Sequence, residues 1–279
     1  MSARTLGAAA WPAALLCVAL SACAPMTRSD APSAEPVRVY AAGSLREALT
    51  AIARDHEART GQKVALTFGA SGLLRERIEQ GERAEVFASA DTDHPQRLAR
   101  AGAWQAPVVF TRNQLCALTS DRVSTTPATL LATLLDPQVR VGTSTPQADP
   151  SGDYAWALFR RADALQPGAY ATLDAKALKL TGGPTSPQAP AGRGTYAWLM
   201  DEGRADVFLT YCTNAVASQK EVPRLKVVQL PPALQVGADY GLGLRRDARP
   251  AAQAFARALR EAPAQQVLRG LGFGALTGG

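Results

Sequence analysis

Histidine and cysteine are scarce in this chain, and their scarcity limits the chemistry open to it. The 279 residues include two histidines, His56 and His94, and four cysteines. None of them is spaced as the ligands of a zinc site are. The sequence holds no glycine-rich loop ending in Lys-Ser or Lys-Thr, and both histidines are expected at the surface rather than beside a nucleophile. We therefore expect no metal ion, no cofactor and no enzymatic activity.

Aromatic residues are also few, at 6% of the chain, and the 30 lysines and arginines are scattered. Short pairs such as Arg160-Arg161 and Arg245-Arg246 do not form the basic stripe with interleaved aromatics that a nucleic-acid surface needs. The composition thus argues against a nucleic-acid partner. The net charge of +6 creates a mild positive field, which can steer a small anion toward the protein.

The long apolar run of the sequence lies at its start. Arg4 precedes an apolar segment, Leu6–Leu20, that a proline interrupts and that is too short for a confident membrane span. The next residues, Leu20-Ser21-Ala22-Cys23, match a lipobox, in which cleavage occurs before a cysteine that already carries lipid. We predict a lipoprotein signal peptide over residues 1–22 and lipidation of Cys23.

Residues 23–35 are polar and rich in Pro and Ser, as expected for a tether. A lipidated Cys23 carries more than one acyl chain and therefore gives a stable anchor. The sequence thus predicts a periplasmic protein that is lipid-anchored to a bacterial membrane. The alternative is a soluble exported protein cut after Ala24, and Pro25 just past that cut is unfavourable.

Short apolar β-type runs alternate with segments of helical periodicity along the rest of the chain. The first three strands are expected at Val37–Tyr40, Val64–Phe68 and Glu85–Ala88, and the helices after them at Leu45–Arg59, Gly72–Gln80 and His94–Ala101. This order is typical of an α/β fold with a doubly wound parallel sheet.

The alternation lapses at two short strands, Val108–Thr111 and Leu115–Leu118, and then a second series of strands and helices begins. Late strands bring the chain back. We therefore predict two doubly wound α/β lobes joined by a hinge, one formed by residues 36–109 plus 238–279 and the other by residues 110–237. Loops at the carboxyl ends of the strands are expected to line the cleft between the lobes.

Two strand-to-helix junctions carry the strongest functional signal. Ala41-Ala42-Gly43-Ser44 and Gly69-Ala70-Ser71-Gly72 each place a hydroxyl and free backbone N–H groups at the start of a helix. Such N-termini bind anions, because the first-turn N–H groups lack partners and the helix dipole adds positive charge there. The alternative is that Ser44 and Ser71 are ordinary N-caps, worth about 1 kcal/mol each.

Two cysteines, Cys116 and Cys212, remain after the signal region, and both lie in or beside apolar strand-like runs. An exported protein meets an oxidising compartment, which favours a disulfide between them. Two buried thiols are the alternative.

The junction residues resemble those of the periplasmic molybdate-binding proteins, the receptors of ABC importers. The resemblance is densest in Val39–Leu45, Phe68–Leu74 and Val86–Asp91, and weaker in Pro150–Ala155 and Phe208–Ala215. It implies a type II periplasmic-binding-protein fold, a monomer that delivers its ligand to an ABC permease in the inner membrane, and a ligand that is a molybdate or tungstate oxyanion with no cofactor.

The resemblance also implies a ligand shell of two serines, backbone amides of the second lobe and one tyrosine hydroxyl. These fall on Ser44, Ser71, Gly142, Gly192 or Arg193, and Tyr211. The chain departs from the family in a longer, Gly- and Pro-rich segment at Thr181–Gly194 and in the turn after Gly142. Plain packing is the alternative role for Tyr211, and a surface or hinge position is the alternative for Arg193.

A shell of neutral donors favours a fully deprotonated dianion, because an anion that carries a proton needs an acceptor. Molybdate, tungstate and sulfate meet this condition, whereas phosphate at neutral pH does not. A sensory lipoprotein that uses the same cleft without transport is the alternative to an importer subunit.

Overall fold

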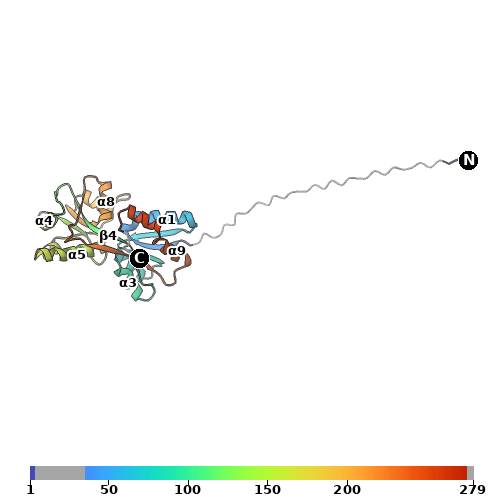
Figure 1. Ribbon diagram of the computed structural model, residues 1–279, viewed down its shortest axis with the longest axis horizontal. Helices are drawn as coiled ribbons and strands as arrows, with labels where there is room; N and C mark the ends of the chain where they lie inside the picture. Colours follow the sequence, from blue (N-terminus) through green and yellow to red (C-terminus); the bar gives the residue numbers. More distant parts are fainter. Residues whose placement is uncertain (4–34, 275–279) are drawn as a thin grey trace. The chain divides into compact units, whose positions relative to one another are not determined.

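The computed structural model of the chain describes residues 1–3 and 35–274, and residues 35–274 belong to one compact unit (Figure 1). The predicted signal peptide and the lipidation site Cys23 fall almost entirely in residues 4–34, outside the described residues. No helix in the described part of the chain is long and apolar enough to cross a membrane.

A single mixed sheet organises residues 35–274. Its strands lie in the order β2-β1-β3-β9-β4-β7-β5-β6, and β8 pairs with β4 beside this path. Their bounds are β1 Val37–Ala42, β2 Val64–Gly69, β3 Val86–Ser89, β4 Val108–Thr119, β5 Val141–Ser144, β6 Leu178–Thr181, β7 Val207–Tyr211, β8 Lys226–Gln229 and β9 Gly237–Leu244. The first three strands run parallel, as do β5, β6 and β7, while β4 and β9 are antiparallel to their neighbours.

The helices follow the strands in sequence. They are α1 Arg46–Thr60, α2 Ser71–Glu79, α3 Asp93–Arg100, α4 Leu130–Leu135, α5 Pro150–Leu165, α6 Ala169–Lys176, α7 Thr195–Asp201, α8 Cys212–Glu221, α9 Pro250–Ala258 and α10 Ala262–Gly270, with a 3₁₀ turn, η1, at Gly43–Leu45. Figure 1 shows α1, α3 and α9 on one side of β4 and α4, α5 and α8 on the other. The predicted α/β class with a periplasmic-binding-protein topology is confirmed.

Strand β4 is continuous where the sequence predicts two short strands. Its first part, Val108–Gln114, pairs with β9, and Leu115–Thr119 pairs with β7. The polar pair Arg112-Asn113 resembles a turn, but the Arg112 guanidinium donates to Asp239 across the ladder at 2.6 Å, and Asn113 is 3% exposed. Tertiary partners therefore keep these two residues in an extended strand that crosses from one group of strands to the other.

The start of α5 is fixed by its first residues. Asp149 is the N-cap, with its side chain accepting the Ser151 N–H at 3.0 Å, and Pro150 occupies the first turn. Capping by an aspartate and proline in the first turn are both favourable at a helix start. The helix thus begins at Pro150, directly after its cap.

Both histidines are buried, and the prediction of exposed histidines is wrong. His56 is 4% exposed and lies edge-on to Phe255 at 5.1 Å, while His94 is 5% exposed. Burial lowers the pKa of His56, and it lowers the pKa of His94 to about 4, helped by the nearby positive charge of Arg75. Both rings are neutral at physiological pH.

Cys116 in β4 and Cys212 at the start of α8 are joined by a disulfide with an S–S distance of 2.03 Å. They approach because β4 and β7 are antiparallel neighbours, with Cys116 opposite Thr210. Of the two alternatives that the sequence leaves open, the structure therefore contains the disulfide, which ties the first turn of α8 to the central strand.

Candidate functional site

A cleft of about 1120 Å³ opens where several strands end and their helices begin. Its wall includes five of the residues predicted for the ligand shell: Ser44, Ser71, Gly192, Arg193 and Tyr211. The wall combines segments from both predicted lobes. The structure thus brings together residues separated by up to about 170 positions in the chain.

Ser71 is the most enclosed of the predicted ligand residues. It is 1% exposed, and its Oγ accepts the Ala90 N–H at 3.1 Å. The N-cap of α2 is Ala70, so Ser71 belongs to the first turn and is not the cap that the alternative interpretation assumes. A hydroxyl that accepts one bond still carries a hydrogen to donate. Ser71 can therefore donate to an anion at the positive end of α2.

Ser44 occupies the corresponding position after β1, in η1. Its Oγ lies 2.9 Å from the Tyr240 hydroxyl, which also accepts the Asn113 side-chain N–H at 3.3 Å. The cap position of η1 is Ala42, so Ser44 is not an N-cap either. Because Asn113 donates to the Tyr240 oxygen, the Tyr240 hydroxyl can donate its own hydrogen to Ser44 Oγ. The hydrogen of the Ser44 hydroxyl can then point toward another acceptor.

Tyr211 ends β7, and its ring lies at the base of the cleft. It is 2% exposed, and its hydroxyl donates to the Ala90 carbonyl at 3.2 Å. Burial raises the pKa of this phenol well above its usual value. Ser71 and Tyr211 thus both bind Ala90, Ser71 at its N–H and Tyr211 at its carbonyl. Tyr211 can donate to a ligand only by giving up the Ala90 carbonyl.

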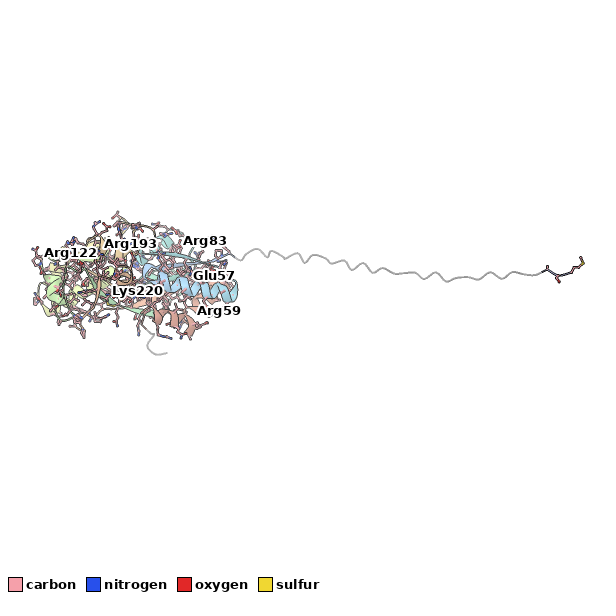
Figure 2. All side chains as sticks on the ribbon, turned by 90° about the horizontal axis from the view of Figure 1, so that it is seen from above. Glu57, Arg59, Arg83, Arg122, Arg193 and Lys220 are labelled. Carbon is pink, nitrogen blue, oxygen red and sulfur yellow. A yellow bond between two sulfur atoms is a disulfide. The ribbon has the colours of Figure 1, made fainter. Side chains whose placement is uncertain are left out.

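Arg193 lies on the cleft wall with its charge already paired. Its guanidinium donates to Glu221 at 2.6 Å and to Asp201 at 2.9 Å, and the Gly194 N–H donates to the second Glu221 oxygen at 2.8 Å. These hydrogen bonds raise the pKa of Arg193. Arg193 therefore fastens the loop after β6 to α7 and α8, and Figure 2 shows it in the middle part of the molecule. Gly192 beside it has φ +82, which glycine adopts freely.

Gly142 is not among the residues that line the cleft, and its place in the ligand shell stays a prediction. It lies inside β5, opposite Leu178 in β6 and Phe208 in β7. A Cβ atom at this position would lie 2.7 Å from the Phe208 ring. The glycine is therefore required for packing, and the strand continues to Ser144 before the chain turns toward the cleft.

Sequence reasoning missed further cleft residues, among them Asp149, Tyr196, Thr213 and Asn214. Thr213 and Asn214 follow β7 at the start of α8, just as Ser44 and Ser71 follow β1 and β2, so the same junction signal could have found them. The Asn113 side chain donates to Thr213 Oγ1 at 2.8 Å. A third helix N-terminus, that of α8, therefore contributes to the cleft.

Asp149 adds a carboxylate to this wall of hydroxyl and amide donors. It lies between α5 and the Ser144–Tyr196 hydroxyl pair, whose oxygens are 3.3 Å apart. Burial raises the pKa of Asp149 to about 6, although the Ser151 N–H and the Ser144 hydroxyl oppose this shift by donating to it. Within residues 35–274, no lysine, arginine or histidine forms an ion pair with Asp149.

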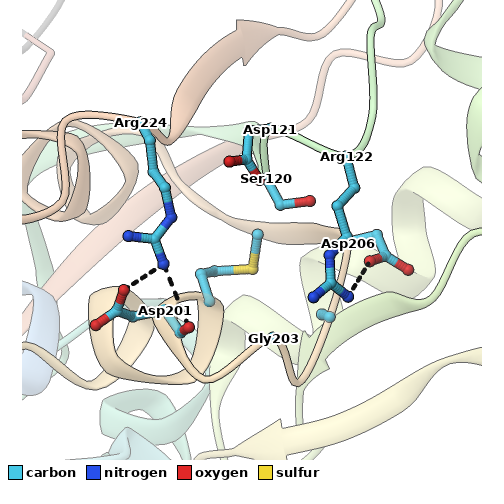
Figure 3. Close-up of a pocket in the computed structure, with 9 residues that line it drawn as sticks. Ser120, Asp121, Arg122, Asp201, Gly203, Asp206 and Arg224 are labelled. Carbon is cyan, nitrogen blue, oxygen red and sulfur yellow. Dashed lines mark hydrogen bonds and ion pairs between the residues drawn. The ribbon is translucent and has the colours of Figure 1, made fainter.

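A second, smaller cavity of about 420 Å³ lies away from the cleft (Figure 3). Its charged side chains pair with each other: Arg224 contacts Asp201, and Arg122 approaches Asp206, which also binds Arg140 at 2.7 Å. Because both of its arginines lie beside carboxylates, this cavity is a weaker candidate for an anion than the cleft. No group of three or more His, Cys, Asp or Glu residues in the described part of the chain could hold a metal ion.

Comparisons with known proteins agree with this architecture. Residues 37–274 match the bacterial extracellular solute-binding protein family. An uncharacterized protein of Pasteurella multocida strain Pm70 is 38% identical over 207 residues, which cover 74% of this chain and 86% of that protein.

Two solved structures share the fold. The sulfate-binding protein SubI of Mycobacterium tuberculosis H37Rv aligns with a TM-score of 0.69 at 18% identity, covering 85% of this chain and 86% of that chain. The periplasmic molybdate-binding protein of Azotobacter vinelandii aligns with a TM-score of 0.66 at 18% identity, covering 86% of this chain and 100% of that chain. The chain has the type II periplasmic-binding-protein fold and belongs to the bacterial extracellular solute-binding proteins, a family of binding proteins rather than enzymes.

Proposed function

We propose that this protein captures a small oxyanion in the cleft, with molybdate or tungstate as its ligand, and delivers it to an ABC importer. The observation that carries the proposal is the pair of serines, Ser44 and Ser71, at two consecutive strand-to-helix junctions on the wall of one cleft. Their neutral hydroxyls and the N–H groups around them stabilise an anion without a counter-cation.

The N-terminus of α8 supports the same ligand class. Thr213 and Asn214 line the same cleft as the serine junctions. Both side chains are held by hydrogen bonds to neighbours. Three helix N-termini that share one cleft give a concentration of positive partial charge that suits a dianion. The Arg193 guanidinium is already paired with Asp201 and Glu221, so Arg193 is not the group that we expect to bind the ligand.

Sulfate is the second candidate, because the fold also aligns with a sulfate-binding protein and because sulfate is a dianion of the same tetrahedral shape. The sequence predicts that the protein is a monomer, that lipid on Cys23 holds it at the membrane, and that the permease is its partner. A sensory role of the same cleft without transport is the alternative, and transport assays in cells that lack the protein distinguish the two.

Isothermal titration calorimetry with molybdate, tungstate and sulfate tests the proposal. Ser71→Ala should weaken binding by about 1.5–3 kcal/mol, the usual value of a hydrogen bond to a charged group. Ser120→Ala is the matched control, since Ser120 is a buried serine (7% exposed) that lines the smaller cavity and not the cleft. Absence of heat with all three anions, or equal losses in the two variants, would contradict oxyanion capture.

A further inference from the structure

Asp149 stands out in the cleft because an anion site gains nothing from an additional negative charge. One carboxylate oxygen, Oδ1, caps α5 by accepting the Ser151 N–H at 3.0 Å. The other, Oδ2, faces Gly182 on the opposite segment, where a Cβ atom would lie 2.6 Å from it. Gly182 and Asp149 both line the cleft. Capping of α5 therefore uses one carboxylate oxygen, and the Ser144 hydroxyl also donates to the carboxylate.

A backbone contact brings Asp149 to the serine side of the cleft. The Gly72 N–H, in the first turn of α2, donates to the Ala148 carbonyl at 2.8 Å. Asp149 follows Ala148 directly, and Ser71 precedes Gly72, so the carboxylate and the Ser71 hydroxyl lie on the two sides of this contact. An anion held by Ser71 at the N-terminus of α2 therefore lies close to a carboxylate that has no counter-ion.

The charges of two further carboxylates, Asp153 on α5 and Asp91 after β3, help to raise the pKa of Asp149. The titratable neighbours from other elements are the phenols of Tyr196 on α7, Tyr211 on β7 and Tyr240 on β9, and the charge of Asp149 raises the pKa of each of them. A second ionised oxyanion beside Asp149 therefore meets a like charge on a carboxylate that forms no ion pair within residues 35–274.

We propose that Asp149 makes anion capture proton-linked, so that the occupied site holds one proton between the Asp149 carboxyl and the bound oxyanion. This inference rests on the proposed function, oxyanion capture in the same cleft. An anion that brings its own hydrogen, such as hydrogen phosphate, donates it to the ionised carboxylate. A fully deprotonated anion, such as sulfate or molybdate, binds together with a proton taken from water, which then sits on Asp149 and donates to the anion.

The proposal predicts opposite pH behaviour for the two kinds of anion. Burial is the main cause that raises the pKa of Asp149 to about 6, and a bound dianion raises it further by repulsion. Between these two pKa values the affinity for sulfate should fall by about tenfold for each pH unit, as proton linkage requires. From about pH 6 to about pH 8, titration calorimetry of the wild-type protein should show a loss of up to about 100-fold for sulfate and molybdate.

Asp149→Asn is the decisive variant, because asparagine caps a helix about as well as aspartate and so preserves α5. In this variant the sulfate affinity should be independent of pH and should exceed that of the wild type at about pH 8. Hydrogen phosphate should bind the wild type better than sulfate at about pH 8, and the variant should reverse this order. Glu47→Gln, which removes an exposed carboxylate from the rim of the same cleft, should keep the wild-type pH dependence.

A second measurement on the wild-type protein does not depend on any variant. Titrations with sulfate at about pH 7 in two buffers of different ionisation enthalpy should reveal the uptake of about one proton for each anion bound. Binding of sulfate or molybdate without proton uptake and with a flat pH profile would overturn this inference and leave oxyanion capture intact. No binding of any of the anions at either pH would overturn both.

Discussion

Closure of the cleft over a ligand should depend on Gly72 having no side chain. Gly72 lies in the first turn of α2, and its Cβ position is 2.3 Å from the Gln147 carbonyl oxygen and 2.7 Å from the Ala148 carbonyl oxygen. Both atoms belong to backbone, and Gln147 has φ +66, so the opposing segment cannot move aside as a flexible side chain does. We predict that Gly72→Ala prevents the two walls of the cleft from meeting.

The magnitude follows from two costs that fall on the closed form alone. Overpacking by one methyl group costs about 1–3 kcal/mol. Separation of the walls also breaks the Gly72–Ala148 hydrogen bond, which is worth about 1 kcal/mol. A total of about 2–4 kcal/mol corresponds to an affinity loss of about 30-fold to several hundred-fold. An open form pays neither cost, and alanine in α2 stabilises that helix by up to about 1 kcal/mol.

Calorimetry and small-angle X-ray scattering together test this reasoning. Gly72→Ala should lose affinity for the anion while its unfolding temperature stays near that of the wild type, and its radius of gyration should not decrease when ligand is added. Gly270→Ala is the matched control, since Gly270 is also in a helix and has nothing within 4 Å of its Cβ position. Equal affinities of Gly72→Ala, Gly270→Ala and the wild type would refute the assignment of this contact to the closed form.

Three further predictions concern stability and the cleft wall. Replacing Cys116 and Cys212 by serine should lower the free energy of unfolding by about 2–5 kcal/mol in urea titrations, because the disulfide closes a long loop. This loss should be no larger than the loss caused by reducing the disulfide of the wild-type protein. Glu85 accepts two hydrogen bonds from Arg249, which lower the pKa of the Glu85 carboxyl in the folded protein. The stability that this shift contributes is present above the pKa of Glu85 in the unfolded chain, about 4.3, and is lost as the pH falls further. Glu85→Gln should therefore flatten the acid side of the plot of melting temperature against pH. Arg193→Gln should reduce anion affinity far less than Ser71→Ala does, because the Arg193 charge is already paired, and a larger loss would place its guanidinium on the ligand.

The alternation of strands and helices was predictable because each strand is an apolar run and each helix has one apolar face. Helix α6 escaped prediction because only Ala169 and Leu173 in it are buried, too few to show helical periodicity. The strand β4 was divided in two because Asn113 is polar, and no local pattern reveals that its buried amide donates to Thr213 and Tyr240, which are 100 and 127 residues away.

The two serines of the site were predictable for a different reason. Their position depends on a local rule, since a residue just after a parallel strand must lie at the carboxyl edge of the sheet. Gly142 was assigned to the ligand shell by the resemblance and by its spacing from Pro146, and β5 extends two residues beyond it. A position counted along a loop is reliable only when the end of the preceding strand is known.

Asp149 shows the limit of a sequence-based view of ligand choice. In the sequence it is one of several acidic residues near the start of a helix, and no local pattern marks it as part of the cleft. Only the contact between Gly72 and Ala148, which joins segments about 76 residues apart, places its carboxylate beside the serine junctions. A cleft with donors alone discriminates against protonated anions, whereas a cleft that also holds an acceptor favours them. The choice between sulfate-like and phosphate-like ligands therefore turns on one carboxyl group and on the pH at which it is measured, so a selectivity series at a single pH would misassign the ligand.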